Sequence, residues 1–205
     1  MVDILYEDNH VIVAYKPANM LSQQDCTNDK DILTVLKQYI KTKYNKPNEV
    51  FLGLLHRLDR MTSGVMVFAR TSKAASRISE DIKNHKFYKE YIAIVEGTLP
   101  LNSKKTIELF MSKDEKNNKS FVDSKGKQAI LEYEVLEVFN NKTKVKVNLK
   151  TGRHHQIRVT FSYLGHPLVG DIKYGSKYKE DLNLKAYKLS FHHPITKELM
   201  TFERE

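Results

Sequence analysis

Short apolar runs and strict alternation of apolar and polar residues predict several β-strands along this chain. Residues 11–15 are entirely apolar and are stopped by Lys16-Pro17, a pattern typical of a buried strand. Residues 90–96 are rich in aromatic and β-branched side chains and also predict a sheet strand. Apolar and polar positions alternate in residues 131–135 and 145–149, which predicts two half-exposed strands, the second with a lysine-rich outer face.

Two longer segments have the period of an amphipathic α-helix. In the first, apolar side chains recur at Ile32, Leu36, Tyr39 and Ile40. We expect this helix to run from about Asn28, with Asn28 or Asp29 as its N-cap, to near Tyr44. Ser72 can cap the second helix. Its apolar face would consist of Ala75, Ile78 and Ile82.

The remaining segments complete the expected architecture. Residues 156–163 predict a short helix closed by Gly165. Residues 18–28 are polar and predict a loop, and the lysine-rich residues 112–127 predict a long mobile loop. Because strands and helices do not alternate regularly, we expect an α+β fold with a mixed, mainly antiparallel sheet rather than a doubly wound one.

Composition narrows the function class and the compartment. The 205 residues are 40% hydrophobic, which is enough for one substantial core, and we expect a single domain over residues 1–205 rather than two. The net charge of +9 fits a polyanionic partner such as RNA, although it also occurs in proteins that are merely soluble. The single cysteine, Cys26, excludes an internal disulfide and a Cys-x-x-Cys metal site. No apolar run exceeds five residues and the acidic N-terminus lacks the pattern of a secretory signal, so we expect a cytoplasmic protein.

One nonapeptide carries the strongest chemical signal. It reads His56-Arg57-Leu58-Asp59-Arg60-Met61-Thr62-Ser63-Gly64. Apolar residues before and after it predict two buried strand segments joined by a polar turn. An aspartate between two arginines suits a nucleophile or base near neutral pH, and the arginines suit a phosphate-bearing substrate. From these residues alone, a salt-bridged aspartate in a surface turn is an equally good interpretation.

Several motifs together resemble one known family. The nonapeptide resembles HRLDxxTSG of the RluA-type pseudouridine synthases, which isomerise uridine in ribosomal and transfer RNA. Further blocks match the same family in the same order along nearly the whole chain. They are Tyr6–His10 with Tyr15-Lys16-Pro17, the block Lys89–Gly97, Gly152–Arg158, Leu164–Asp171 with Tyr174-Gly175, and Phe191–Pro194.

The resemblance implies a pseudouridine synthase fold around a central RNA-binding cleft, and it assigns chemical roles to three residues. Asp59 would attack C1′ of the ribose or remove its C2′ proton, and the sequence does not choose between these two routes. Arg158 would pair with Asp59, and Tyr91 would contact the uracil and could handle the C5 proton. The residues alone favour a solvated helix residue for Arg158 and a core aromatic for Tyr91.

The same resemblance implies that the other motif residues bind RNA or shape the site. Arg57 would fill the gap left by a flipped base. The predicted RNA-binding residues are Arg57, Arg60, Arg153, His154 and Gln156, of which Arg153 and His154 could equally brace their loop. His56, Thr62 and Gly64 would shape the catalytic turn. We expect no cofactor, no metal, no N-terminal S4-like domain, a monomer, and RNA, as a ribosomal or transfer RNA stem-loop, as the partner.

Two details depart from the family pattern, and two rival functions remain. Val159 is followed by Thr160 where the family often has histidine, and Lys185 interrupts the family's LHA before the last strand. The pairs His154-His155 and His192-His193 invite a metal-dependent hydrolase or nuclease, but the HExxH spacing is absent. The other rival is a non-catalytic RNA-binding or assembly protein that keeps the fold. Intact Asp59, Tyr91 and Arg158 argue against it.

Overall fold

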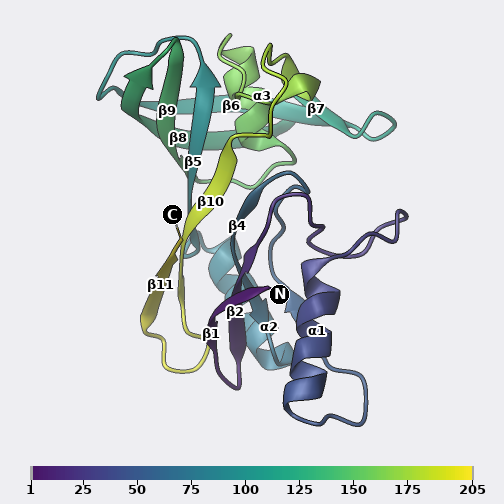
Figure 1. Ribbon diagram of the computed structural model, residues 1–205. Coiled ribbons are helices and arrows are strands. Elements are labelled where there is room, and N and C mark those ends of the chain that lie inside the picture. The colour runs from purple at the N-terminus through teal and green to yellow at the C-terminus, as the bar shows by residue number, and fades with distance from the viewer. Residues whose placement is uncertain (1, 205) are drawn as a thin grey trace. The chain divides into compact units, whose positions relative to one another are not determined.

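The computed structural model describes residues 2–204, which form two compact units (Figure 1). The first unit extends to Tyr88 and resumes at Ala186, and the second consists of Lys89–Lys185. The first unit is therefore discontinuous in sequence, with the second inserted into it. The expectation of a single domain stays a prediction, and each unit is described by itself.

The first unit is built around a sheet with the strand order β1-β2-β4-β10. The strands of this row are β1 (Asp3–Glu7), β2 (Val11–Lys16), β4 (Ser63–Ala69) and β10 (Leu184–His192). Two shorter strands extend it, because β3 (Gly53–Leu54) pairs with β4 and β11 (Leu199–Glu203) pairs with β10. The pairs β1–β2, β2–β4, β3–β4 and β10–β11 are all antiparallel. Strands thus form on either side of the Asp59 turn, as expected, but only β4 is buried, whereas β3 is a two-residue strand that is half-exposed.

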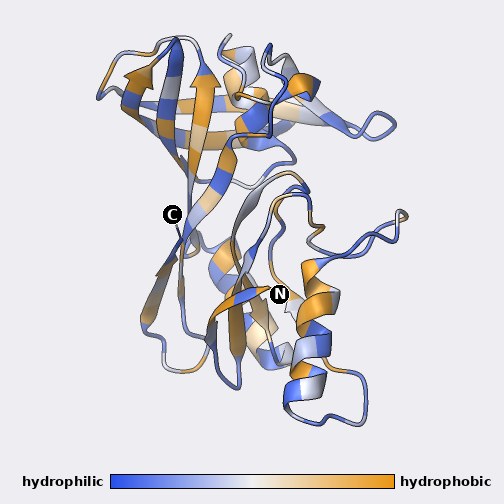
Figure 2. Cartoon of the chain, viewed as in Figure 1, coloured by the Kyte–Doolittle hydropathy of each residue, from blue (hydrophilic) through white to orange (hydrophobic). Residues whose placement is uncertain are grey.

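The core of the first unit explains the apolar runs 11–15 in β2 and 65–69 in β4. Residues of both faces of these strands are buried, as the run Val11–Ala14 illustrates with no exposed surface. In Figure 2, which colours the chain by hydropathy, β2 is mostly orange, the colour of hydrophobic residues. Side chains from β2, β4, β10 and the second helix form one cluster. Its buried members are Val11, Val13, Val65, Val67, Ile78, Phe87, Leu189 and Phe191. Since strands buried on both faces have no polar side to alternate with, they read as continuous apolar runs.

Both helices of the first unit form where expected, but their N-caps differ from the predicted ones. In α1 (Ile32–Lys43) the cap is Asp31, whose carboxylate accepts a hydrogen bond from the backbone N of Thr34 at 2.9 Å. Asp31 forms a β-bridge with Leu21, and Asn28 has a left-handed φ of +57°, so the helix does not start at Asn28 or Asp29. In α2 (Ser72–Lys83) the cap is Thr71, which is extended, and Ser72 is already helical. The expected end of α1 at Tyr44 is confirmed.

The second unit contains a five-stranded antiparallel sheet with the order β5-β9-β8-β6-β7. Its strands are β5 (Tyr88–Glu96), β6 (Lys104–Asp114), β7 (Lys119–Val122), β8 (Lys127–Phe139) and β9 (Lys142–Leu149). The helix α3 (Gln156–Tyr163) and a 3₁₀ turn, η1 (Ile172–Tyr174), follow. Phe161 of α3 lies against Tyr133, with ring centroids 5.3 Å apart, so α3 covers one face of this sheet. The expected closure of α3 by Gly165, which has φ of +80°, is confirmed.

Residues 112–127 are not the expected mobile loop. They contain the end of β6, a four-residue turn and the whole of β7, so they form a β-hairpin. On one face of the hairpin Met111 and Ser120 are buried, Phe121 lies on the other face, and Phe121 and the lysines are exposed. The many lysines obscure the strand pattern in the sequence. In a strand with one face exposed to solvent, every second position can be polar. The expected α+β arrangement with mainly antiparallel pairing is confirmed in each unit.

Candidate functional site

Asp59 lies in the irregular segment between β3 and β4, where the chain makes a tight turn. The backbone N of Thr62 donates to the carbonyl oxygen of Asp59 at 3.0 Å and closes this turn. Leu58 is buried beside it, and Asp59 itself is half-buried. The turn is therefore anchored by an apolar side chain and presents its carboxylate at the boundary between core and solvent.

Two buried polar side chains from residues 16–22 hold the backbone on both sides of Asp59. The Ser22 hydroxyl donates to the carbonyl oxygen of Leu58 at 2.7 Å and accepts from the backbone N of Leu58 at 3.0 Å. The Lys16 ammonium donates to the carbonyl oxygens of Arg60 at 3.2 Å, Met20 at 2.7 Å and Pro17 at 3.0 Å. Burial lowers the pKa of Lys16 to about 8, against the opposing influence of the Asp59 charge.

The residues expected to shape the turn occupy positions suited to that role. His56 accepts from the backbone N of Val67 through Nε2 at 3.2 Å, which ties the turn to β4, and its ring lies against Phe87. Thr62 is buried and closes the turn through its backbone. Gly64 has φ of +146°, and a Cβ there would lie 2.3 Å from the carbonyl oxygen of Ala186. Only glycine permits this approach.

The two arginines that flank Leu58 and Asp59 are both exposed. Arg60 forms an ion pair with Asp29 of the polar loop, with Nη1 and Oδ2 2.7 Å apart. Arg57 projects from the same turn. Exposed guanidinium groups are suited to bind the phosphate groups of RNA. That Arg57 and Arg60 contact RNA stays a prediction.

In the second unit, Arg158 is a buried residue of α3 with a fixed orientation. Its Nε and Nη2 donate to the two carboxylate oxygens of Asp171 at 2.7 and 2.8 Å. The side chains of Arg158 and Asp171 are 8% and 1% exposed, so the pair lies almost wholly out of water. The Tyr174 ring lies 4.9 Å from the guanidinium carbon. Arg158 and Asp59 belong to different units, and their expected pairing stays a prediction.

A short network connects the start of α3 to the β6–β7 hairpin. His155, which precedes α3 and has φ of +53°, contacts the Tyr174 hydroxyl through Nδ1 at 2.8 Å. Burial, together with the nearby charge of Arg158, lowers the pKa of His155 to about 2, so its ring stays neutral. His154 stacks on His155 at 3.7 Å and contacts the Ser120 hydroxyl through Nδ1 at 2.8 Å. The same Tyr174 hydroxyl accepts from the backbone N of Ser120 at 2.9 Å.

The other motif residues of the second unit have mainly internal contacts. Gln156 is buried and its side chain bonds to Thr151, the backbone N of Arg153 and the carbonyl oxygen of Ile130. Arg153 is exposed, and its Nε donates to the carbonyl oxygen of Gln128 at 2.7 Å. These bonds brace the loop before α3, and the predicted RNA contacts of Arg153, His154 and Gln156 stay predictions. Tyr91 is buried in β5, opposite Val147 of β9.

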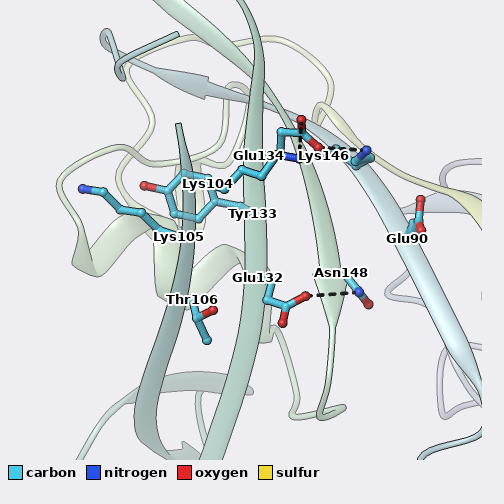
Figure 3. A pocket seen from close by; sticks show the side chains of 9 residues that line it. All are labelled: Glu90, Lys104, Lys105, Thr106, Glu132, Tyr133, Glu134, Lys146 and Asn148. Atoms are coloured by element: carbon cyan, nitrogen blue, oxygen red, sulfur yellow. Dashed lines mark hydrogen bonds and ion pairs between the residues drawn. The ribbon is translucent and has the colours of Figure 1, made fainter. Parts of the chain in front are cut away.

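A separate groove of about 370 Å³ lies on the sheet of the second unit (Figure 3). Glu134 forms ion pairs there with Lys104 at 3.1 Å and Lys146 at 3.0 Å, and Asn148 donates to Glu132 at 3.4 Å. Glu132 and Glu134 alternate with residues buried toward α3, so the groove lies on the opposite face of the sheet. Its charges compensate one another, and none of the predicted site residues lines it. It is therefore not the candidate site.

The rival metal site has no structural counterpart among residues 2–204. No group of three or more histidine, cysteine, aspartate or glutamate side chains is arranged there to hold a metal ion. His154 and His155 instead engage Ser120 and Tyr174, and His193 contacts Asp8. Within the same residues, no helix is long and apolar enough to span a membrane.

Sequence reasoning missed four residues of these arrangements, namely Lys16, Ser22, Asp171 and Ser120. Lys16 and Asp171 belong to motifs of the family, but no sequence spacing indicates their hydrogen-bond partners, which are Arg60 for Lys16 and Arg158 for Asp171. Ser22 and Ser120 carried no signal beyond being single polar residues in polar segments. Their roles follow only from which backbone and side-chain atoms the fold brings together.

Comparison with known sequences connects these features to one family. The sequence profile described as "RNA pseudouridylate synthase" matches residues 10–163. "Ribosomal large subunit pseudouridine synthase D" of Buchnera aphidicola is 32% identical over 97% of this chain and 67% of its own length. The protein of the same description from Borreliella burgdorferi is 38% identical over 92% of this chain and 60% of its own length. "Uncharacterized RNA pseudouridine synthase YlyB" of Bacillus subtilis is 35% identical over 98% of this chain. The chain thus spans about two thirds of the length of these relatives.

Solved structures show the same fold at lower identity. "Human RNA Pseudouridylate Synthase Domain Containing 1" superposes with a TM-score of 0.77 at 24% identity and covers all of this chain and 83% of that structure. "Human RNA Pseudouridylate Synthase Domain Containing 4" has a TM-score of 0.80 at 23% identity, covering 99% of this chain and 88% of that structure. The expected fold is therefore confirmed.

Proposed function

Because the chain belongs to the RNA pseudouridylate synthase family, we propose that it isomerises a uridine in RNA to pseudouridine and that Asp59 is the reacting carboxylate. The observation that carries the proposal is the position of Asp59. It lies half-buried in a turn that two buried polar side chains hold, within the residues that match the family profile. Exposed arginines flank it on the same turn.

The reaction breaks the C1′–N1 glycosidic bond, turns the uracil and joins it to the ribose again through C5. No electrons enter or leave, and no group donor is needed. Asp59 either attacks C1′ and forms a covalent intermediate, or removes the C2′ proton and leaves a glycal. Both routes need an ionised carboxylate against the ribose, and both end with loss of the C5 proton and return of Asp59 to its starting state.

Arg158 and Tyr91 are the proposed partners of Asp59. Arg158 would supply the positive charge that favours the carboxylate form of Asp59. Asp171 adds a role that the sequence did not suggest, because its bidentate bonds fix the plane of the Arg158 guanidinium. Tyr91 would hold the uracil and accept or relay the C5 proton.

RNA is the proposed partner, and no protein partner or cofactor is required. A uracil in a structured stem-loop must leave its stack before a carboxylate can reach its sugar, and Arg57 would occupy the vacated space. The relatives named for the large ribosomal subunit make its RNA the first substrate to test, with transfer RNA the second. We propose that the protein acts as a monomer in the cytoplasm.

The test compares the wild type with Asp59→Asn, which keeps the size of the side chain and removes the nucleophile or base. Unmodified transcripts of large-subunit ribosomal RNA and of transfer RNAs are incubated with each protein, and pseudouridine is mapped by chemical labelling. We expect formation by the wild type, which persists in EDTA, and less than a few per cent of that rate in Asp59→Asn. RNA affinity should change little, since phosphate contacts dominate it.

Retention of a substantial rate by Asp59→Asn would contradict the role of Asp59. A wild type that binds both RNAs but modifies neither would favour the non-catalytic alternative. Pseudouridine maps of total RNA from a strain lacking the gene, compared with its parent, would then identify the natural position or show that none exists.

A further inference from the structure

Lys89 of the second unit carries a positive charge that no group of residues 2–204 neutralises. Its ammonium forms no hydrogen bond and no ion pair with these residues, and burial lowers its pKa. The side chain is half-buried and lies on the same face of β5 as Tyr91 and Ala93, which is the buried face. A lysine in such a place usually has acceptors, as Lys16 has in three carbonyl oxygens. Lys89 therefore keeps an unfavourable charge that a bound anion would compensate.

The ammonium lies beside Gly152, in the loop that leads to α3. A Cβ built on Gly152 would lie 3.4 Å from the Nζ of Lys89. Apart from the chain neighbours of Gly152, no other heavy atom of residues 2–204 lies within 4 Å of that position. Gly152 is exposed, and its backbone N donates to no acceptor among the same residues. Because glycine lacks a side chain, one ligand can reach both the N–H and the ammonium from solvent.

Arg153 adds a second cation to this loop. Its Nε donates to the carbonyl oxygen of Gln128 at 2.7 Å, which holds the guanidinium in place. The two Nη groups have no acceptor among residues 2–204, and Arg153 is exposed. A guanidinium held through Nε presents its Nη groups in a fixed plane. The loop thus combines two cations that lack a carboxylate partner with one backbone N–H that lacks an acceptor.

We propose that Lys89, the backbone N–H of Gly152 and the guanidinium of Arg153 bind a phosphodiester group of the RNA, next to the nucleotide whose uracil Tyr91 would hold. The inference rests on the proposed function, which makes RNA the partner. It adds Lys89 and Gly152 to the predicted RNA-binding residues. It also gives Arg153 a defined ligand in place of a choice between RNA and its own loop.

A phosphodiester fits this arrangement better than a base does. Its charge is permanent, and its unesterified oxygens accept hydrogen bonds from ammonium, guanidinium and backbone N–H groups alike. A base is neutral and would leave both cations uncompensated. Lys89 and Tyr91 are two residues apart on one strand face, which is about 6.6 Å along the strand. A single nucleotide can therefore contact Tyr91 with its base and Lys89 with its phosphate.

The first experiment contrasts Lys89→Met with Lys144→Met. Lys144 is a matched control, because it is half-buried in the same unit and also has no ion pair among residues 2–204. It lies on the opposite face of the sheet, across from Ile94. Binding of one unmodified transcript is measured at several salt concentrations. We expect Lys89→Met to lower the slope of log affinity against log salt by about 0.7–0.9, and Lys144→Met to leave it unchanged.

Two further measurements separate a phosphate contact from other roles of Lys89. In urea, Lys89→Met should unfold at the same denaturant concentration as the wild type or at a higher one, because no acceptor of residues 2–204 loses its donor. In single turnover its saturating rate should stay within about threefold of wild type, while the half-saturating enzyme concentration rises at least about fivefold. Lys89→Arg, which keeps the charge, should bind more tightly than Lys89→Met.

The second experiment uses Gly152→Ala, which closes the space beside the ammonium. The φ of Gly152 lies outside the left-handed region, and its new Cβ would be in ordinary contact with Lys89. The variant should therefore keep its stability, whereas the methyl group should obstruct the phosphate and weaken RNA binding. Combined with Lys89→Met, its effect should be less than additive, since both changes act on one contact.

Four results would overturn the phosphate site. They are an unchanged salt slope in Lys89→Met, an equal loss of slope in Lys144→Met, a destabilised Lys89→Met, and wild-type affinity in Gly152→Ala. A lower saturating rate with an unchanged slope would assign Lys89 to the base instead. Failure of the proposed function is a separate outcome, because a wild type that binds RNA without forming pseudouridine still gives a salt slope for comparison.

Discussion

Arg158 and Asp171 form a bidentate ion pair in the interior of the second unit. The two parallel hydrogen bonds, at 2.7 and 2.8 Å, fix both the distance and the plane of the guanidinium group. Thirteen positions separate the partners, which lie in α3 and just before η1. The orientation of Arg158 is therefore set within its own unit and does not depend on bound RNA.

Loss of this pair should be strongly destabilising. Asp171→Ala would leave a buried guanidinium without its carboxylate, and we expect the free energy of unfolding to fall by about 3 kcal/mol or more. Urea denaturation of the purified variant measures this change. Asp181→Ala, which removes an exposed carboxylate of the same unit, is the control and should change stability by less than about 0.5 kcal/mol. Similar values for the two variants would argue against a structural pair.

The proposed electrostatic role of Arg158 can be tested through the acidic limb of the pH–rate profile. Arg158→Met removes the positive charge, so the proton should compete for Asp59 at higher pH and the acidic limb should move upward. Arg158→Lys keeps the charge but loses the bidentate geometry, so its limb should stay in place while its rate falls. If the acidic limbs of the Arg158→Met and Arg158→Lys profiles lie at the same pH, the charge of Arg158 has no electrostatic role, and Arg158 acts only by positioning.

His155 predicts a specific pH dependence of stability. In the unfolded chain the imidazole binds a proton below about pH 6.5. In the folded chain its pKa is lowered to about 2, so it stays neutral there. Stability is therefore lost as pH falls below about 6.5, because the unfolded state then binds more protons.

The measurement compares urea unfolding of wild type and His155→Gln at pH 7.5 and pH 5. Part of the His155 ring is exposed to water, which reduces the effect of its pKa shift. Between pH 7.5 and pH 5 we expect the free energy of unfolding of the wild type to fall by on the order of 1 kcal/mol more than that of the variant. Carboxylates with lowered pKa, such as Glu7 and Asp8, contribute equally to both proteins. Parallel losses in the two proteins would contradict the assignment.

We expect the β6–β7 hairpin and the turn that follows it to contact the RNA backbone. Replacement of the five exposed lysines of residues 112–127 by glutamine should weaken RNA binding and flatten its salt dependence; they are Lys113, Lys116, Lys119, Lys125 and Lys127. The slope should fall by about 0.9 for every phosphate that a lysine no longer neutralises. Phe121, which is 47% exposed, should contribute about 1–3 kcal/mol to binding if an unstacked base lies on it, as Phe121→Ala would reveal.

The matched control for the hairpin changes the net charge equally but at other sites. It replaces five exposed lysines of the first unit, Lys46, Lys73, Lys83, Lys86 and Lys197, by glutamine. Binding of one transcript is measured across several salt concentrations. If both variants flatten the slope equally, general charge rather than the hairpin accounts for the affinity.

Much of this fold could be predicted because local signals and tertiary structure agree. The apolar runs of β2 and β4, the helical period of α1 and the closure of α3 by Gly165 all follow from residues close in sequence. The family was identifiable because its motifs are long and ordered along the chain. The N-caps were missed by one to three residues, since the bridge from Leu21 to Asp31 is a long-range contact that no local pattern encodes.

The sequence predicted the residues proposed to react, but not the residues that hold them in place. Asp59 and Arg158 carry a chemical signature, whereas Ser22 and Asp171 act through partners that only the fold brings near. The sequence pattern places Lys16 only at the end of a strand, because a lysine after an apolar run is usually exposed. In the structure it is fully buried. The hairpin at 112–127 was mistaken for a loop because its outward lysines masked the period of two.

The close approach of Gly64 to Ala186 has a consequence for how the protein is made. On the ribosome, residues 56–64 emerge long before Ala186, and the whole second unit is synthesised between them. Until that happens, β4 lacks its neighbour β10, and the segment that carries Asp59 remains attached to an unfinished sheet. A chain interrupted after residue 185 would contain every proposed catalytic residue and still lack the strand that completes the first unit. Acquisition of activity should therefore coincide with synthesis of the segment from Ala186 onward rather than with synthesis of the motifs themselves.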